Sequence, residues 1–235
     1  MIRTIRAGER HFSDFGWLKT YWLFSFDTYH DPNNVQFGSL RVFNDDVVKP
    51  GGGFPTHHHR EMEIITTVLS GEITHQDSIG NKTVIKAGDV QRMTAGTGIA
   101  HSEHNLGDSP VHLYQIWIHP GVRGLTPGYD QKSFEPESRK NRLLPVASGR
   151  ETAGAVAIHT DSTIYMADLG AGNSVDFEMG DGRGVFVYVT SGELGVNEAR
   201  LTTKDQARID SESALRLEAY DDTSMILIDV PMGRR

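Results

Sequence analysis

The sequence contains no cysteine among its 235 residues. This absence excludes disulfide bonds and thiolate metal sites, so any metal ion must be held by nitrogen and oxygen ligands. Long hydrophobic runs are also lacking. No stretch approaches the roughly 18 apolar residues of a membrane span, and the N-terminal stretch lacks the apolar segment of a signal peptide. We therefore expect a cytoplasmic protein with no membrane partner.

Positive charge is scarce. Lys and Arg together number 23 against 31 Asp and Glu, which gives a net charge of -8. A protein surface that binds nucleic acid needs basic residues to neutralise phosphates. The acidic total therefore argues against direct binding of nucleic acid.

Long amphipathic helices are a third absence, and short strand-like segments stand in their place. Glycine (25 residues) and proline (9 residues) separate short runs of β-branched and aromatic residues, such as EIITTVLSGEI at 63–73. Evenly spaced short strands with turns between them are typical of a β-sandwich or β-barrel. The charged, proline-interrupted stretch 131–141 predicts a linker with at most a short helix.

The chain also repeats itself. IITTVLSGEI at 64–73 aligns without gaps with VFVYVTSGEL at 185–194, and AGDVQRM at 87–93 aligns loosely with TKDQARI at 203–209. Chance similarity between two β-hairpins is the alternative, but two matches in the same order favour duplication. We therefore predict an all-β protein of two tandem barrels, with domains at 1–132 and 145–235 and a linker at 133–144.

Two histidine clusters indicate a metal site in the first barrel only. They are THHHREME at 56–63 and GIAHSEHN at 98–105, and ten of the eleven histidines precede residue 120. A lone H-x-H motif is more often a surface feature than a ligand pair. A second cluster about forty residues later makes a metal site the better interpretation.

Strand geometry selects candidates within these clusters, because side chains at i and i+2 of a strand share a face. His57 and His59 are expected to point one way and His58 the other. His101 and Glu103 are expected to share a face in the same manner.

The fourth ligand stays open at this point. Glu103 is one candidate, and Glu63, four residues after His59, is the other. A set of three imidazoles and one carboxylate with an open position suits Fe(II), Mn(II), Ni(II) or Co(II).

Other features are interpreted as structural. His75 is expected at a hairpin edge, and Asp45 and Asp46 are expected in a turn before a strand. The aromatic side chains of GWLKTYWLFSFDTY at 16–29 are expected in the core and between domains, and not as a substrate platform.

Several stretches together resemble the pirin family. They are GWLKTYWLFSFDTYHDP, SLRVFNDDVVKPGGGF, the H-x-H motif, MEIITTVLSGEITHQDSIGN, and MTAGTGIAHSEHN followed by HLYQIWI. The resemblance is dense over the first 130 residues or so and thins afterwards. Pirins belong to the cupin superfamily, so it implies a bicupin: two tandem cupin-type (jelly-roll) β-barrels with a metal site in the N-terminal barrel only.

The resemblance also implies a ligand set. It places one metal, usually iron, on His57, His59, His101 and Glu103, which favours Glu103 over Glu63. Fe(II) is the expected metal, with Mn, Ni, Co, Cu or Zn as alternatives. The family commonly has proline where this chain has His58, so the entry to the first strand is expected to differ.

The implied activity is that of a quercetin 2,3-dioxygenase, which opens a flavonol ring with O2, with Glu103 as general base. A redox-sensing iron protein that binds a transcription or metabolic partner is the alternative, and a bicupin with another natural substrate is a third. A flavonol-like substrate and O2 are thus the expected partners, with a protein partner in the alternative. We expect a monomer, since two barrels can bury each other's open edges.

Overall fold

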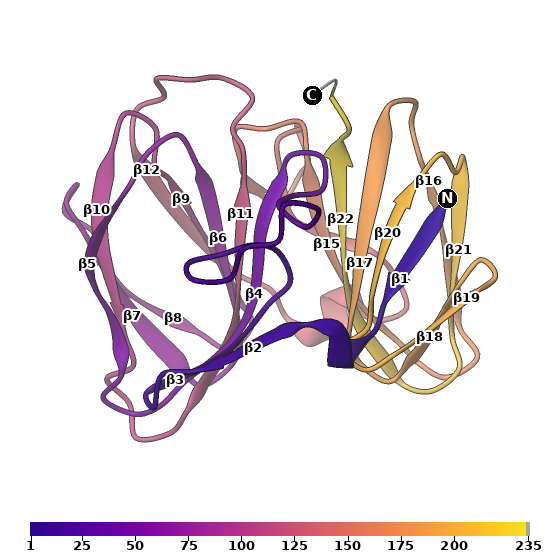
Figure 1. The fold of residues 1–235 in the computed structure, drawn as a ribbon, viewed down its shortest axis with the longest axis horizontal. Coiled ribbons are helices and arrows are strands. Elements are labelled where there is room, and N and C mark those ends of the chain that lie inside the picture. The colour runs from indigo at the N-terminus through magenta and orange to yellow at the C-terminus, as the bar shows by residue number, and fades with distance from the viewer. Residues whose placement is uncertain (234–235) are drawn as a thin grey trace.

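The computed structural model describes residues 1–233 as two β-domains side by side (Figure 1). The helices in these residues are the short 3-10 turns η1 (Ala7–Glu9) and η2 (Pro136–Arg139). No helix among the described residues is long and apolar enough to cross a membrane. The second turn lies within the predicted linker.

The first domain pairs a seven-stranded sheet with a four-stranded sheet. The larger sheet consists, in spatial order, of β12 (Gly128–Ser133), β9 (Asp89–Thr94), β6 (Glu63–Ser70), β11 (Val111–Ile118), β4 (Leu40–Val48), β3 (Leu18–Trp22) and β2 (His11–Asp14). The smaller sheet consists of β5 (Gly53–His59), β10 (Ile99–His104), β7 (Glu72–Asp77) and β8 (Lys82–Lys86).

The second domain repeats this arrangement. Its larger sheet consists of β1 (Ile2–Ile5), β20 (Gln206–Asp210), β17 (Arg183–Ser191), β22 (Thr223–Pro231), β15 (Thr163–Leu169), β13 (Leu144–Ser148) and β14 (Val156–Ala157). Its smaller sheet consists of β16 (Ser174–Glu178), β21 (Ala214–Ala219), β18 (Glu193–Val196) and β19 (Ala199–Thr202).

The predicted repeat corresponds to equivalent strands. β6 and β17 hold the same place in the two larger sheets, and each is flanked on one side by the next repeated segment, β9 or β20. Each of these pairs is antiparallel. The prediction of two tandem β-barrels is therefore confirmed.

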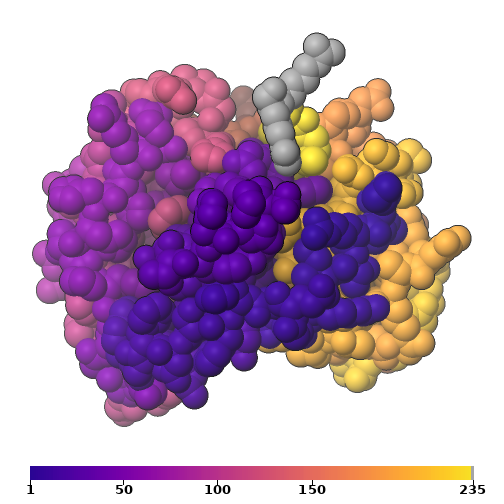
Figure 2. Space-filling view, viewed as in Figure 1, coloured from indigo at the N-terminus to yellow at the C-terminus, as the bar shows by residue number. Residues whose placement is uncertain are grey.

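The N-terminal strand crosses to the far domain. β1 pairs antiparallel with β20, with Ile2 opposite Ile209 and Ile5 opposite Gln206. Figure 2 shows the indigo N-terminal residues lying across both halves of the molecule. Nothing in the sequence pattern predicts this pairing, and the domain boundaries given above stay a prediction.

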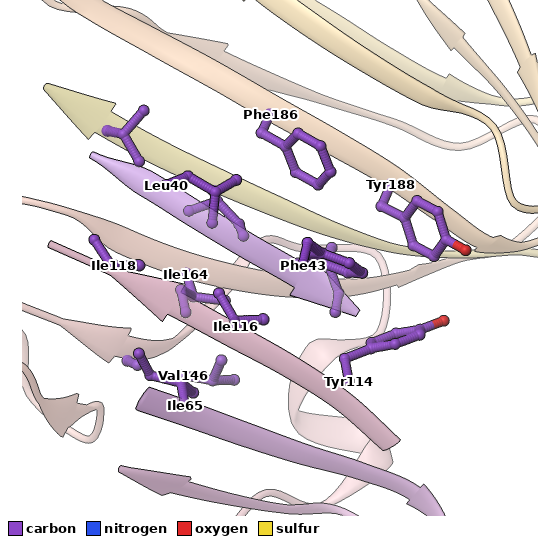
Figure 3. Packing of buried hydrophobic residues seen from close by; sticks show 14 of the residues in the cluster. Leu40, Phe43, Ile65, Tyr114, Ile116, Ile118, Val146, Ile164, Phe186 and Tyr188 are labelled. Atoms are coloured by element: carbon purple, nitrogen blue, oxygen red, sulfur yellow. The ribbon is translucent and has the colours of Figure 1, made fainter. Parts of the chain in front are cut away.

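The two larger sheets pack face to face and form the interdomain core. In Figure 3, Phe43 of β4 and Tyr114 of β11 lie against Phe186 and Tyr188 of β17. The ring centroids of Phe43 lie 5.3 Å from Phe186 and 4.9 Å from Tyr188. These rings are completely buried, so the core belongs to both domains.

Asp45 lies in the middle of β4 and faces this interface, so the turn predicted there is wrong. Its carboxylate accepts hydrogen bonds from His112 Nε2 at 2.6 Å and the Tyr188 hydroxyl at 2.7 Å, and Lys204 Nζ lies 3.0 Å away. Burial opposes ionisation, but the His112 hydrogen bond and the charge of Lys204 lower the pKa of Asp45 to about 2. A polar strand segment was mistaken for a turn because both faces of β4 are buried.

The interiors of the two barrels differ. The second is filled by a cluster of buried apolar side chains that includes Leu169, Val187, Leu194, Leu217 and Leu227. The first instead contains the histidine clusters and several buried polar groups described below. Among the described residues, the side chains that could bind a metal ion therefore lie in the first barrel.

Candidate metal centre and cavity

Two neighbouring strands bring the histidine clusters together. β5 and β10 are antiparallel, with His101 opposite His57 and Ile99 opposite His59. His58 is exposed, whereas His57 and His59 are partly buried, as alternation along a strand requires. The predicted facing of these three side chains agrees with the structure.

A β-bulge interrupts the pairing of β5 with β10. Between His101 and Glu103 the register shifts, so that Glu103 lies opposite Phe54. The extra residue of β5 falls next to Pro55, which has no N–H to give to the ladder. The strand entry thus bends at Pro55 and not at the residue between the two histidines.

The three imidazoles converge on one point. The ring centroids of His57 lie 4.7 Å from His59 and 4.4 Å from His101, and those of His59 and His101 lie 4.9 Å apart. One nitrogen from each ring lies within 4.8 Å of the others. Such convergence of neutral nitrogen donors is typical of a site for a divalent transition metal.

Two of the rings have a nitrogen free to face that point. His57 Nδ1 lies 2.8 Å from the Pro55 carbonyl, which can only accept, so Nδ1 carries the hydrogen and Nε2 has the lone pair. His101 Nε2 is buried and has no hydrogen-bond partner among the described residues. A buried polar atom without a partner is costly, and a metal ion would satisfy this one.

Burial and the neighbouring imidazoles keep His59 and His101 neutral. Burial, with His57 and His58 nearby, lowers the pKa of His59 to about 4. Burial, with His57, His59 and His75 nearby, lowers the pKa of His101 to about 2. Neutral imidazole is the form that binds metal.

Glu103 lies deeper in the same cavity and is 2% exposed. One carboxylate oxygen, Oε2, accepts a hydrogen bond from Gln115 Nε2 at 2.8 Å, and Oε1 lies 3.4 Å from the Thr66 hydroxyl. Burial raises the pKa of Glu103 to about 7, although both of these donors oppose the shift. One Glu103 oxygen also lies within 4.8 Å of a nitrogen of His101.

Glu63, the other candidate ligand, lies elsewhere. Its Oε2 accepts hydrogen bonds from the Thr94 hydroxyl and the His159 backbone N–H, both at 3.1 Å, so it faces the second domain. The spacing of four residues from His59 does not place Glu63 on the same face, because a turn, with Glu61 at a φ of +51°, separates β5 from β6. Alternation holds only within one strand.

His75 does not lie at an edge as expected. β7 is an inner strand between β10 and β8, and His75 is fully buried. Its Nδ1 lies 3.4 Å from His101 Nδ1, and its Nε2 lies 3.1 Å from Asp77 Oδ2. Burial lowers the pKa of His75 although Asp77 opposes the shift.

A cavity of about 320 Å³ opens above the candidate ligands, and its walls are largely aromatic. Its aromatic lining consists of Phe15, Trp17, Trp22, Phe26, Phe54 and Trp117. The expectation that segment 16–29 serves only core packing is therefore partly wrong. Alternation along β3 sends Trp22 into the cavity, while Phe24 beyond it joins the interdomain core.

The aromatic wall is linked to Glu103 through one amide. Trp117 Nε1 donates to Gln115 Oε1 at 3.1 Å, and indole N–H can only donate. The Gln115 amide is thereby oriented with its NH2 group toward Glu103. Trp117 also packs edge-on against His59, with ring centroids 4.9 Å apart.

Asp46, like Asn44 and Gln115, is a polar residue of the cavity wall that sequence reasoning missed. It follows Asp45 on β4 and faces the opposite side, into the cavity. Its Oδ1 is buried and has no hydrogen-bond partner among the described residues. Burial raises its pKa to about 7, and the negative charges of Asp45 and Glu103 contribute to the shift.

Within residues 1–233, the groups of side chains that could hold a metal all lie in the first barrel. This chain contains two tandem β-barrels, which makes it a bicupin. The first barrel holds the converging imidazoles under an aromatic cavity, and the second is filled with apolar side chains.

Comparison with known proteins gives the family. A family profile described as pirin matches residues 5–118, and one described as a quercetinase C-terminal cupin domain matches residues 145–230. The chain is 42% identical over 218 residues to a pirin-like protein of Caulobacter vibrioides, covering 92% of this chain and 94% of that one. The chain belongs to the pirin family, as its sequence motifs indicated.

Two further relatives concern activity and metal. A protein of Escherichia coli (strain K12) named quercetin 2,3-dioxygenase is 40% identical over 232 residues, covering 98% of this chain and 99% of that protein. The crystal structure of bacterial pirin YhhW from Escherichia coli in complex with nickel(II) has a TM-score of 0.94 at 40% identity, covering 98% and 99% of the two chains. These findings support a site for a divalent metal ion in the first barrel. They do not identify the metal.

Proposed function

We propose that this protein is a metal-dependent dioxygenase that opens the ring of a flavonol such as quercetin with O2. The observation that carries the proposal is the placement of three converging imidazoles and Glu103 at the base of an aromatic-walled cavity. The quercetin 2,3-dioxygenase name of a relative that matches over nearly the whole chain supports the substrate class.

His57, His59, His101 and Glu103 would hold the metal, with Fe(II) as the proposed ion and Mn, Ni, Co, Cu or Zn as alternatives. The donor set fits, because burial keeps His59 and His101 neutral and His101 Nε2 lacks a hydrogen-bond partner among the described residues. When bound, the metal would lower the pKa of a flavonol hydroxyl, as a cation does for water, and so make the ring easier to oxidise.

Glu103 would accept the hydroxyl proton as general base. Its Oε2 is held by Gln115 at 2.8 Å, so Oε1, with only a long contact to Thr66, is the freer oxygen. Burial raises the pKa of Glu103 to about 7 in the metal-free protein, and a bound cation would lower it, so that the carboxylate would be ionised and able to accept the proton.

The cavity walls would select and orient a flat aromatic ligand. Trp117 and Phe26 meet edge to face with ring centroids 5.3 Å apart, and Trp22 continues the wall beyond Phe26 at 5.5 Å. Such rings offer stacking surfaces, and their apolar faces exclude water from the ring under attack.

The test is turnover by protein loaded with Fe(II), Mn(II), Ni(II), Co(II) or Cu(II), measured as O2 uptake and loss of flavonol absorbance. We expect at least one metal form to exceed the free metal, and Trp117→Ala to raise KM more than it lowers kcat. If no metal form exceeds free metal, the dioxygenase proposal fails. A partner whose affinity changes with the iron redox state would then favour the redox-sensing alternative.

We further propose that the protein is a cytoplasmic monomer.

A further inference from the structure

Behind His101 lie two buried polar side chains, His75 and Asp77, that no step of the proposed reaction uses. His75 Nδ1 lies 3.4 Å from His101 Nδ1, and His75 Nε2 lies 3.1 Å from Asp77 Oδ2. The side chains of His75 and Asp77 are both fully buried. These contacts run directly from the candidate metal ligand to a carboxylate.

Only one arrangement of hydrogens satisfies every atom of this chain. The carboxylate of Asp77 can only accept, so the neutral His75 ring carries its hydrogen on Nε2 and a lone pair on Nδ1. That lone pair requires the hydrogen of His101 to be on Nδ1. His101 Nε2 then has its lone pair toward the other imidazoles, where it lacks any protein partner among the described residues.

The reverse arrangement is unfavourable at both ends. A hydrogen on His75 Nδ1 would leave its Nε2 lone pair facing the Asp77 carboxylate. It would also move the hydrogen of His101 to Nε2, where it would be buried without an acceptor and would block a metal ion. Leaving such buried groups unpaired is costly at each end.

We propose that His75 and Asp77 are positioning residues that fix the tautomer of His101. Its Nε2 then carries the lone pair that binds the metal. This role also explains why His75, although close enough to His101 and Glu103 to be a ligand itself, is not one: both of its nitrogens are engaged. The inference rests on the proposed metal site and not on the proposed substrate.

The decisive variant is Asp77→Asn. The amide oxygen can still serve the turn, where Asp77 Oδ1 accepts from the backbone N–H groups of Ile79 and Asn81. The amide NH2 would instead face His75 Nε2 as a donor and reverse the chain. In metal-free protein, imidazole 15N chemical shifts should then show the hydrogen of His101 moved from Nδ1 to Nε2.

Metal affinity gives the second readout, measured with Ni(II) by chelator competition. Asp77→Asn should weaken Ni(II) binding on the order of 10–100-fold, the range typical of partners behind a metal ligand. Asn81→Ala is the matched control. It removes the other donor to Asp77 Oδ2, at 2.8 Å, without changing the direction of the chain, and should bind Ni(II) like wild type.

Substitution of His75 separates polarity from packing. His75→Leu should weaken Ni(II) binding, whereas His75→Gln, whose amide can accept from His101 and donate to Asp77, should recover most of it. Wild-type Ni(II) affinity and an unchanged His101 tautomer in Asp77→Asn would overturn the inference while leaving the proposed function intact. Failure of wild type to bind any divalent metal would refute both.

Discussion

Asp46→Asn should change how the stability of the metal-free protein depends on pH. Asp46 is 2% exposed in the cavity wall, and its pKa is raised from 3.8 to about 7. A carboxyl with a raised pKa in the folded state binds its proton more tightly there than in the unfolded chain. Its contribution to stability therefore increases as the pH falls from about 7 toward 4, and is lost as the pH rises through 7.

The magnitude follows from the two pKa values. One pKa unit corresponds to about 1.4 kcal/mol. An ionised Asp46 at pH 8 therefore costs roughly 4 kcal/mol, and acidification to pH 5 recovers about 3 kcal/mol of it. Asparagine has no such proton, so the variant should lack this gain. Glu103 adds its own rise to both proteins, and the difference between them reports Asp46 together with its interaction with Glu103.

The assay is urea unfolding at pH 5–8 after removal of metal with a chelator. All three tryptophans, Trp17, Trp22 and Trp117, border the cavity, so their fluorescence reports on the first barrel. Asp130→Asn, an exposed acid on β12, is the matched control and should keep the wild-type profile. Parallel profiles for wild type and Asp46→Asn, within about 0.5 kcal/mol, would refute the reasoning.

Five further substitutions test the site and the interface. His101→Ala should abolish stoichiometric metal binding in equilibrium dialysis, whereas His58→Ala should bind like wild type; equal losses would contradict the parity argument. Glu103→Gln should weaken metal binding at least roughly tenfold. Glu63→Gln should leave metal binding unchanged and cost about 1–3 kcal/mol of stability, and the opposite pattern in metal titration would restore Glu63 as the ligand. Asp45→Ala should lower the free energy of unfolding by about 3–5 kcal/mol, because it leaves the buried Arg10 and the partly buried Lys204 without their carboxylate partner. A loss below about 1 kcal/mol in urea titration would show that the network contributes little.

The candidate site could be predicted as far as alternation within single strands extends. His57 and His59 share a face of β5, and His101 and Glu103 share a face of β10, so two short motifs were enough to name all four as candidates. The preference for Glu103 over Glu63 came only from the resemblance to the pirin family. Their role as ligands stays a prediction, but the structure brings the three imidazoles together. The same argument does not apply to Glu63, because the alternation of side chains is interrupted by the turn between β5 and β6.

The rest of the site depends on neighbours far away in the sequence. Asp45 and Asp46 follow an apolar strand and look like a turn, yet Asp45 is paired with Lys204 of the second domain. His75 gave no local signal of its role, since its partner His101 comes 26 residues later. Spacing along the chain has no information on such pairs until the register of the strands is known.

The pairing of β1 with β20 joins two segments that lie near opposite ends of the chain. Ile2–Ile5 are synthesised about two hundred residues before their partner strand, so the larger sheet of the second domain is completed only when nearly the full chain exists. A fragment that starts after the linker would present the unpaired edge of β20, which invites association with other chains. A bulky fusion placed before Met1 would therefore disturb the second domain, which contains none of the candidate metal ligands.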